Sequence, residues 1–402
     1  MTGPAPLPGT ARLPGTAPLT GSAPRPLLGV GQQELARRSS VKWREYPADV
    51  IPLWVAEMDV LPPAPVVAAL REAIETGDLG YAWGQPYCEA AIDYAAQQWQ
   101  LTVERDQVRL VMSVVGALTE VIRSTPGHGE VVVSAPVYGP FAKAAHEAGR
   151  RLRVVGLGPD LRLDLEAIDA AFAAATSTGG GCLYLLCNPH NPTGVVPTRQ
   201  ELRRLADIAE HHGVTVVSDE IHSPLTMPGI RHSSFLSVAP ESSAVVLFSA
   251  SKAWNVSGAK AAVAFAGRAG VDWLRRLPVS LTHGASHLGV IAHTAALRHG
   301  QPWLSALRSD LMQVRDQLAE LVRRRLPGVR MTLPDASFLA WLDCRELGLG
   351  DDPARHFLDR ARVALSPGLE FVSGGEGFVR LNFATLPSML DRAIGRMAAS
   401  LP

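Results

Sequence analysis

Lysine is scarce in this sequence of 402 residues. Lysine and arginine together number 38, but only four are lysine, at positions 42, 143, 252 and 260. Arginine stays protonated near neutral pH, so chemistry that requires a neutral amine has few candidate side chains here.

The sequence also has few cysteines, no net charge and no long apolar run. The four cysteines (Cys88, Cys182, Cys187 and Cys344) lack metal-ligand spacing, and we expect small core residues in a reducing cytoplasm. The formal net charge is zero, which gives no indication of nucleic acid as a partner. No apolar run reaches membrane length and no signal peptide is evident, so we expect no membrane partner.

The remaining sequence divides into four stretches. Residues 1–28 are rich in Pro, Gly, Ala and Thr, which predicts a disordered tail. In residues 62–275, apolar runs alternate with helical patterns, which predicts an α/β domain with a mainly parallel sheet and helices on both faces. Residues 276–402 change to a long helical stretch and short strands, and we expect a smaller α+β domain that the arm at 29–61 completes.

Lys252 has the best setting of the lysines. The apolar run 244–248 predicts a buried strand, and Lys252 follows it on a loop of small and polar residues. An α/β sheet presents its chemistry at such strand ends. A solvated loop cation would be the ordinary interpretation, but motifs after other predicted strands favour a lysine that binds the aldehyde of pyridoxal phosphate (PLP).

PLP also needs an anion near its pyridinium nitrogen, a donor to its ring oxygen and a stacking partner. Asp219, after a predicted buried strand, can be the anion. Asn191 and His222 can reach the ring oxygen, and Tyr138 can stack on the ring. A helix N-cap for Asp219, a core histidine at 222 and ordinary packing for Tyr138 are the alternatives.

Two further features suit anionic groups. Ser113, Val114 and Val115 begin a predicted helix whose amides can bind phosphate, and Ser249 and Lys260 can add a hydroxyl and a charge.

Arg380 lies inside the apolar strand predicted at 378–383, where an unpaired charge is costly. A substrate carboxylate would be a suitable partner, and an ion pair with a protein carboxylate is the alternative.

Together these segments resemble the fold-type I PLP enzymes, the aspartate aminotransferase superfamily. More narrowly they are similar to its cystathionine β-lyase (C–S lyase, MalY/PatB-type) branch. The segments that carry the resemblance are Ser40–Trp43, Leu53–Asp59, Asn188–Gly194, Ser218–His222, Ser249–Gly258 and Phe378–Asn382. Histidine at 222 is part of it, because many aminotransferases have tyrosine there.

The resemblance implies a seven-stranded-type sheet, a PLP cofactor and a homodimer with shared active sites. It assigns cofactor attachment and proton transfer to Lys252, and catalytic roles to Tyr81 and Tyr138 as well. Tyr81 would reach the phosphate of the neighbouring subunit. The other implied cofactor contacts are Asp219, Asn191, His222, Ser249, Lys260, Ser113, Val114 and Val115, and the implied substrate contacts are Arg380, Asn191 and Trp54. Gly116 and Val372 depart from the pattern, because proline and glycine are expected there.

The activity that the resemblance implies is β-elimination from L-cystathionine or a related cysteine S-conjugate, giving a thiol, pyruvate and ammonia. An aminotransferase would share the early steps and is the first alternative. A PLP-binding regulatory protein is the second, although such proteins usually carry a helix-turn-helix domain where this chain has its Pro/Gly tail.

Overall fold

The computed structural model describes residues 25–125, 129–177 and 179–402. Most of the predicted disordered tail, residues 1–24, lies outside them. The tail prediction is wrong for its last residues, because Pro26–Leu28 form a 3-10 turn, η1, against helix α12 (Gln301–Arg325). Leu27 is buried there, and its backbone N–H donates to Asp310 Oδ2 over 3.2 Å. The burial of one leucine and the bonded amide oppose the ordering entropy of this short turn, and the composition did not indicate them.

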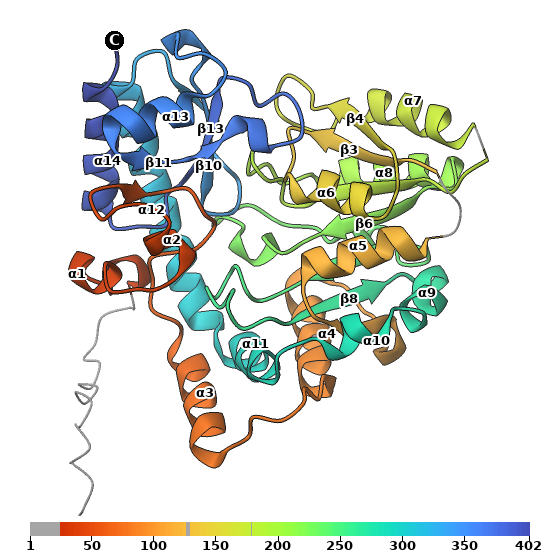
Figure 1. The fold of residues 1–402 in the computed structure, drawn as a ribbon. Helices are drawn as coiled ribbons and strands as arrows, with labels where there is room; N and C mark the ends of the chain where they lie inside the picture. The colour runs from red at the N-terminus through yellow and green to blue at the C-terminus, as the bar shows by residue number, and fades with distance from the viewer. Residues whose placement is uncertain (1–24, 126–128, 178) are drawn as a thin grey trace, which may run out of the picture.

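A seven-stranded sheet forms the centre of the larger part of the molecule (Figure 1). Its order is β2-β8-β7-β6-β5-β3-β4, and the pairs from β7 through β6, β5 and β3 to β4 are parallel. Only β8 is antiparallel to its neighbours β2 and β7. The strands are β2 (Val108–Val111), β3 (Val131–Ala135), β4 (Leu152–Gly156), β5 (Leu183–Cys187), β6 (Thr215–Asp219), β7 (Val245–Phe248) and β8 (Ala262–Ala266).

Both faces of this sheet are buried, which explains why its strands read as continuous apolar runs. In β3, Val131 and Val133 join one apolar cluster while Val132 joins the other, as the two-residue period of a strand requires. The helices around the sheet are α3 (Ala64–Thr76), α4 (Gln85–Trp99), α5 (Val114–Ser124), α6 (Pro140–Glu147), α7 (Leu165–Thr176), α8 (Arg199–His211), α9 (Val271–Arg275), α10 (Val279–His283) and α11 (His287–His299).

The C-terminal part has its own antiparallel sheet of order β12-β13-β10-β9. The N-terminal arm joins it through the parallel pair of β1 and β11. Figure 1 shows α12 and α14 packed against each other in this part. Its elements are α1 (Gln32–Leu35), α2 (Val41–Arg44), β1 (Ile51–Pro52), α12, β9 (Arg330–Met331), β10 (Leu339–Asp343), α13 (Pro353–His356), β11 (Val363–Ala364), β12 (Ser366–Pro367), β13 (Phe378–Asn382) and α14 (Pro387–Ala399).

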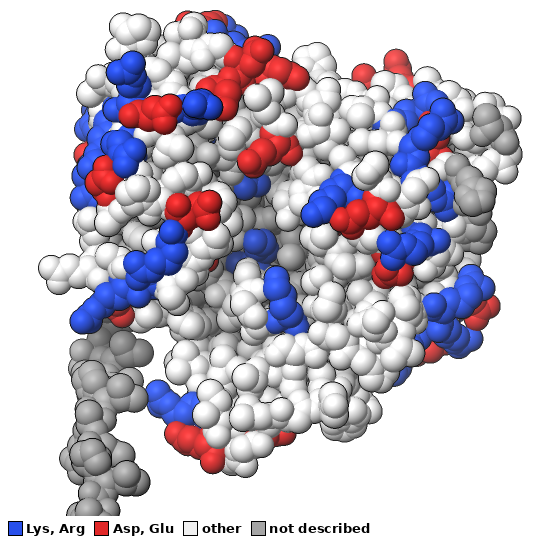
Figure 2. Space-filling view, viewed as in Figure 1, with Lys and Arg blue, Asp and Glu red and all other residues white. Residues whose placement is uncertain are grey.

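The surface is hollowed between the two parts. Figure 2 shows basic side chains inside this central hollow, with acidic side chains mostly on the surface around it. A basic hollow attracts small anions. Within the described ranges, no helix is both long and apolar enough to cross a membrane.

Candidate active site

Lys252 lies in the turn that follows β7, at the carboxyl edge of the large sheet. Its Nζ donates to the backbone oxygen of Ala56 over 2.8 Å, so the N-terminal arm covers the amine. Burial, together with the charges of Arg380 and Lys260, lowers the pKa of Lys252 to about 8. An amine with this pKa is partly neutral near physiological pH, as a nucleophile or a base must be.

Asp219 ends β6, the strand beside β7, and is buried. One carboxylate oxygen accepts from the Ile221 backbone N–H over 3.1 Å. Burial and the nearby charge of Glu220 raise the pKa of Asp219 to about 7, while the charge of Lys252 acts in the opposite direction. The carboxylate would therefore gain from a cationic ring nitrogen placed against it.

A cavity of about 160 Å³ lies beside Lys252, at the N-terminus of α5. The hydroxyl of Ser113 caps this helix by accepting from the Gly116 N–H over 3.1 Å. The unpaired amides of a first helical turn bind anions. In this cavity, serine hydroxyls and a lysine ammonium group surround those amides. The lining residues are Met112, Ser113, Val114, Val115, Tyr138, Ile221, Ser249, Ser251, Lys252, Ser257, Ala259, Lys260 and Ala261.

Arg380 reaches the same region from β13 of the small sheet. Its Nη1 donates to Asn191 Oδ1 over 3.0 Å, and its Nη2 to the Ser366 hydroxyl over 3.0 Å and to the Trp54 carbonyl over 3.3 Å. The guanidinium also lies 4.9 Å from the ring centre of Phe371. These contacts orient the guanidinium without neutralising it, so an incoming carboxylate could still pair with it.

Burial lowers the pKa of Arg380 to about 10. Its Nε is buried and has no hydrogen-bond partner within the described residues. Such an unpaired donor is costly to bury.

Tyr138 and His222 are also brought to this edge. Tyr138 follows β3, its N–H donates to the Asn191 carbonyl over 3.0 Å, and burial beside Asp219 raises its pKa. His222 follows β6 and is buried, and burial with the charges of Lys252 and Arg380 lowers its pKa to about 3. The ring of His222 is therefore neutral at working pH.

Comparison with known proteins gives one family. The family described as aminotransferase class I and II matches residues 48–397. A Mycobacterium tuberculosis protein provisionally named a cystathionine beta-lyase is 48% identical over 392 residues, covering 92% of this chain and 96% of that protein. The chain belongs to the aminotransferase class I and II family.

Two further relatives are informative within this family. The cystathionine beta-lyase PatB of Bacillus subtilis is 31% identical, with 92% of this chain and 98% of PatB covered. The crystal structure of a protein from Corynebacterium diphtheriae, provisionally titled a PLP-dependent beta-cystathionase, superposes with a TM-score of 0.86. It is 30% identical and covers 92% of this chain and 98% of its own. The predicted fold class and family are thereby confirmed.

Tyr81 is placed apart from the other predicted site residues. It lies on the loop between α3 and α4 and its side chain is 100% exposed. It does not line the cavity beside Lys252. Seven of the other predicted residues line that cavity: Ser113, Val114, Val115, Tyr138, Ser249, Lys252 and Lys260. Asn191 and the carbonyl oxygen of Trp54 contact Arg380. Asp219 and His222 do not line the cavity, but both are buried near its lining residue Ile221, at the end of β6 and in the loop that follows.

The sequence analysis did not predict several polar residues that bind the backbone of the N-terminal arm and so support the site. Asn382, two positions after Arg380 on β13, donates to the carbonyls of Val55 and Glu57 over 2.8 and 2.7 Å. Asn255 bonds both the N–H and the C=O of Met58. The two-residue spacing of Arg380 and Asn382 places them on one face of the strand, and this was the signal available for Asn382.

Lys42 and Asp59 form a further support for the arm. Lys42 Nζ lies 2.8 Å from Asp59 Oδ1, and both side chains are fully buried. Lys42 also donates to the Glu57 carbonyl over 2.9 Å. This pair therefore fixes the arm segment whose Ala56 oxygen meets Lys252.

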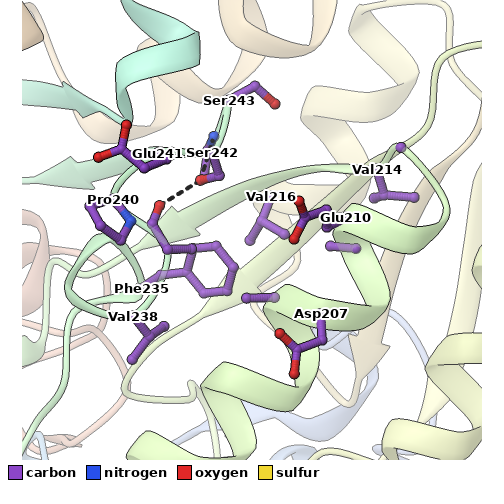
Figure 3. A pocket seen from close by; sticks show the side chains of 15 residues that line it. Asp207, Glu210, Val214, Val216, Phe235, Val238, Pro240, Glu241, Ser242 and Ser243 are labelled. Atoms are coloured by element: carbon purple, nitrogen blue, oxygen red, sulfur yellow. Dashed lines mark hydrogen bonds between the residues drawn. The ribbon is translucent and has the colours of Figure 1, made fainter.

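A larger cavity, of about 500 Å³, lies at the opposite edge of the sheet, where β6 and β7 begin. Figure 3 shows Phe235 in its apolar floor, with Asp207 and Glu210 of α8 on one side and Glu241 on another. It contains none of the predicted site residues. In a parallel α/β sheet the carboxyl edge is the usual place for chemistry, so the smaller cavity is the candidate site.

Proposed function

We propose that this protein is a PLP-dependent C–S β-lyase that acts on L-cystathionine or a related cysteine S-conjugate. The observation that carries the proposal is the partly buried Lys252, whose amine has a pKa lowered to about 8. The charge of this lysine also influences the pKa of the buried carboxyl group of Asp219, on the neighbouring strand. The relatives named cystathionine beta-lyase support the same activity.

The donor set fits PLP. The N-terminus of α5, with Ser249 and Lys260, would hold the phosphate, and Asp219 would pair with the ring nitrogen. Tyr138 would cover the ring, and Asn191 and His222 would serve its oxygen. When bound, PLP supplies an electron sink that stabilises negative charge at the substrate α-carbon.

The protein's own groups would carry the remaining steps. Arg380 would hold the substrate carboxylate through its fork of donors, and Asn191 Oδ1 would keep that fork in place. The neutral amine of Lys252 would take the α-proton, after which the β-carbon–sulfur bond breaks and the sulfur leaves as a thiolate. Hydrolysis of the remaining three-carbon fragment gives pyruvate and ammonia.

The decisive assay follows products. The purified protein with PLP and L-cystathionine should release thiol and pyruvate in equal amounts without an added keto acid. The Lys252→Ala variant should release neither and should lose the visible absorption of the lysine-bound cofactor. Amino-group exchange that depends on an added keto acid, without thiol release, would instead identify an aminotransferase, the activity in the name of the matched family.

We also propose that the enzyme is a homodimer in which Tyr81 completes the neighbouring subunit's site. Tyr81 and the 66% exposed Trp83 lie on one loop with Leu79, next to Ile74 of α3, and all four are exposed apolar or aromatic side chains. Such a surface is typical of an interface.

The four cysteines are free thiols buried in the structure, which supports the proposed cytoplasmic location.

Complementation tests the shared site. Inactive Lys252→Ala and Tyr81→Ala proteins, unfolded and refolded together, should recover about a quarter of wild-type activity, because half the dimers are mixed and each mixed dimer has one intact site. Recovery of no activity, with a monomer in sedimentation, would reject the shared site.

A further inference from the structure

Ser337 has an unfavourable backbone conformation at a buried position. Its φ is +76°, in the left-handed region that disfavours side chains, and it precedes β10. Its N–H donates to the Leu225 carbonyl over 3.0 Å, and the neighbouring Ala336 N–H donates to the Gly194 carbonyl over 3.0 Å. The loops after β6 and β5 therefore force this conformation. Strain that the surroundings maintain in this way often serves a site.

The side chain of Ser337 makes one hydrogen bond within the described residues. Its Oγ lies 3.0 Å from Nδ1 of His222, 115 residues earlier in the chain. Both side chains are buried. The contact joins the segment just before β10 of the small sheet to the loop that follows Asp219.

The surroundings of His222 decide its protonation. Burial disfavours a second proton on the ring, and the charges of Lys252, after β7, and Arg380, on β13, act in the same direction. The imidazole is therefore neutral, and only one of its two nitrogens carries hydrogen.

The Ser337 hydroxyl determines which nitrogen that is. If Nδ1 carried the hydrogen and donated it to Oγ, the hydroxyl proton would remain buried without an acceptor, which is costly. If the hydroxyl donates to Nδ1, both groups are satisfied and the hydrogen lies on Nε2. Within the described residues Nε2 has no hydrogen-bond partner. Unlike the fully buried polar atoms that lack a partner, it retains some accessible surface. It is therefore the nitrogen free to meet a ligand.

We propose that Ser337 is a positioning residue that holds His222 as the Nε2–H tautomer, so that the ring presents a hydrogen-bond donor to the anionic ring oxygen of the cofactor. The ligand end of this proposal rests on the proposed function, whereas the tautomer itself is a property of the protein alone. A donor at the ring oxygen withdraws negative charge from it. The oxygen then holds the neighbouring proton less strongly, so the bound cofactor loses that proton at lower pH.

Histidine ¹⁵N NMR of the cofactor-free protein tests the tautomer. Wild type should show a single Nε2–H pattern for His222, assigned by its loss in His222→Gln. Ser337→Ala and Ser337→Gly should both move the two nitrogens toward averaged shifts. Unchanged His222 shifts in both variants would overturn the proposal.

The two variants separate the hydroxyl from the strain. Alanine keeps the unfavourable φ and glycine relieves it, so their unfolding temperatures should differ while their His222 shifts agree. If Ser337→Ala does not fold, Ser337→Gly alone decides. A result in which only one variant moves the shifts would assign the effect to backbone geometry and would also reject the proposal.

The cofactor-bound protein gives a second readout. In both variants the pH midpoint of the visible absorbance change should rise, by up to about one pH unit for one lost neutral hydrogen bond. An unchanged or lower midpoint would reject the ligand end of the proposal. If the protein binds no PLP, the NMR result still stands, so failure of the proposed function and failure of this inference can be told apart.

Discussion

Arg380 and Asn191 are 189 residues apart in the chain, and Arg380 Nη1 donates to Asn191 Oδ1 over 3.0 Å. The bond joins the small sheet to the loop after β5 of the large sheet. It holds a buried guanidinium whose Nε has no partner in the described part of the chain. The proposed site for the substrate carboxylate therefore lies where the small sheet meets this loop.

Replacing Arg380 by lysine should weaken substrate binding. A lysine keeps the charge but loses the planar fork, and the loss of a charge-assisted hydrogen bond corresponds to a decrease in kcat/KM of about 10- to 150-fold. Most of the decrease should appear as a higher KM in steady-state kinetics. The exposed Arg345→Lys variant is the matched control and should behave as wild type. A normal KM in Arg380→Lys would remove Arg380 from the substrate site.

Cofactor capture should depend on the protonation of Lys252. Its pKa is lowered to about 8, so the neutral fraction rises through pH 8 and then levels, whereas an ordinary lysine would still be gaining reactivity above pH 10. Stopped-flow absorbance of the cofactor-free protein mixed with PLP would give this profile. Arg380→Gln should move it to higher pH, because the arginine charge lowers this pKa. The exposed Lys143→Met control should not move it, and a wild-type rate still rising steeply at pH 10 would contradict the assignment.

Asp219 should destabilise the cofactor-free protein at neutral pH. Its pKa is raised from 3.8 to about 7, so between these values the folded state binds more protons than the unfolded state. Stability then falls as pH rises through this window. Asp219→Asn should therefore unfold at a higher temperature than wild type at pH 8, with the difference vanishing near pH 4. Exposed Asp207→Asn is the control, and a difference that grew toward low pH would have the wrong sign.

The sequence indicated the charged residues of the candidate site more clearly than the residues that support them. Lys252, Asp219 and Arg380 could be found because each is a charged residue inside or directly after an apolar strand. Ser337 and Asn255 could not, because their roles depend on positive φ angles that tertiary contacts impose. The packing of Leu27 could not be predicted for a similar reason, because its partner Asp310 is 283 residues away in the chain.

The buried Lys42–Asp59 pair should respond strongly to single substitution. Lys42→Met leaves the Asp59 carboxylate buried without its cation, a loss of about 3–5 kcal/mol in the free energy of unfolding. The double variant Lys42→Met/Asp59→Leu should recover most of this, because an apolar pair restores packing without a buried charge. Urea unfolding measures both, with Lys143→Met in the exposed pair with Glu147 as control. A double variant no more stable than the single one would show that the arm needs the ion pair itself.

Val372 should limit the stability of the protein. Its φ is +62°, although valine is β-branched and the left-handed region costs a residue with a side chain roughly 1–2 kcal/mol. Val372→Gly should therefore raise the free energy of unfolding by up to about 1 kcal/mol, since glycine tolerates this φ but loses more entropy on folding. Val372→Ala keeps the unfavourable φ and should not stabilise, which separates strain from side-chain size in thermal unfolding. The valine packs beside the cluster that includes Val137, so a less stable Val372→Gly protein would mean that this packing outweighs the strain.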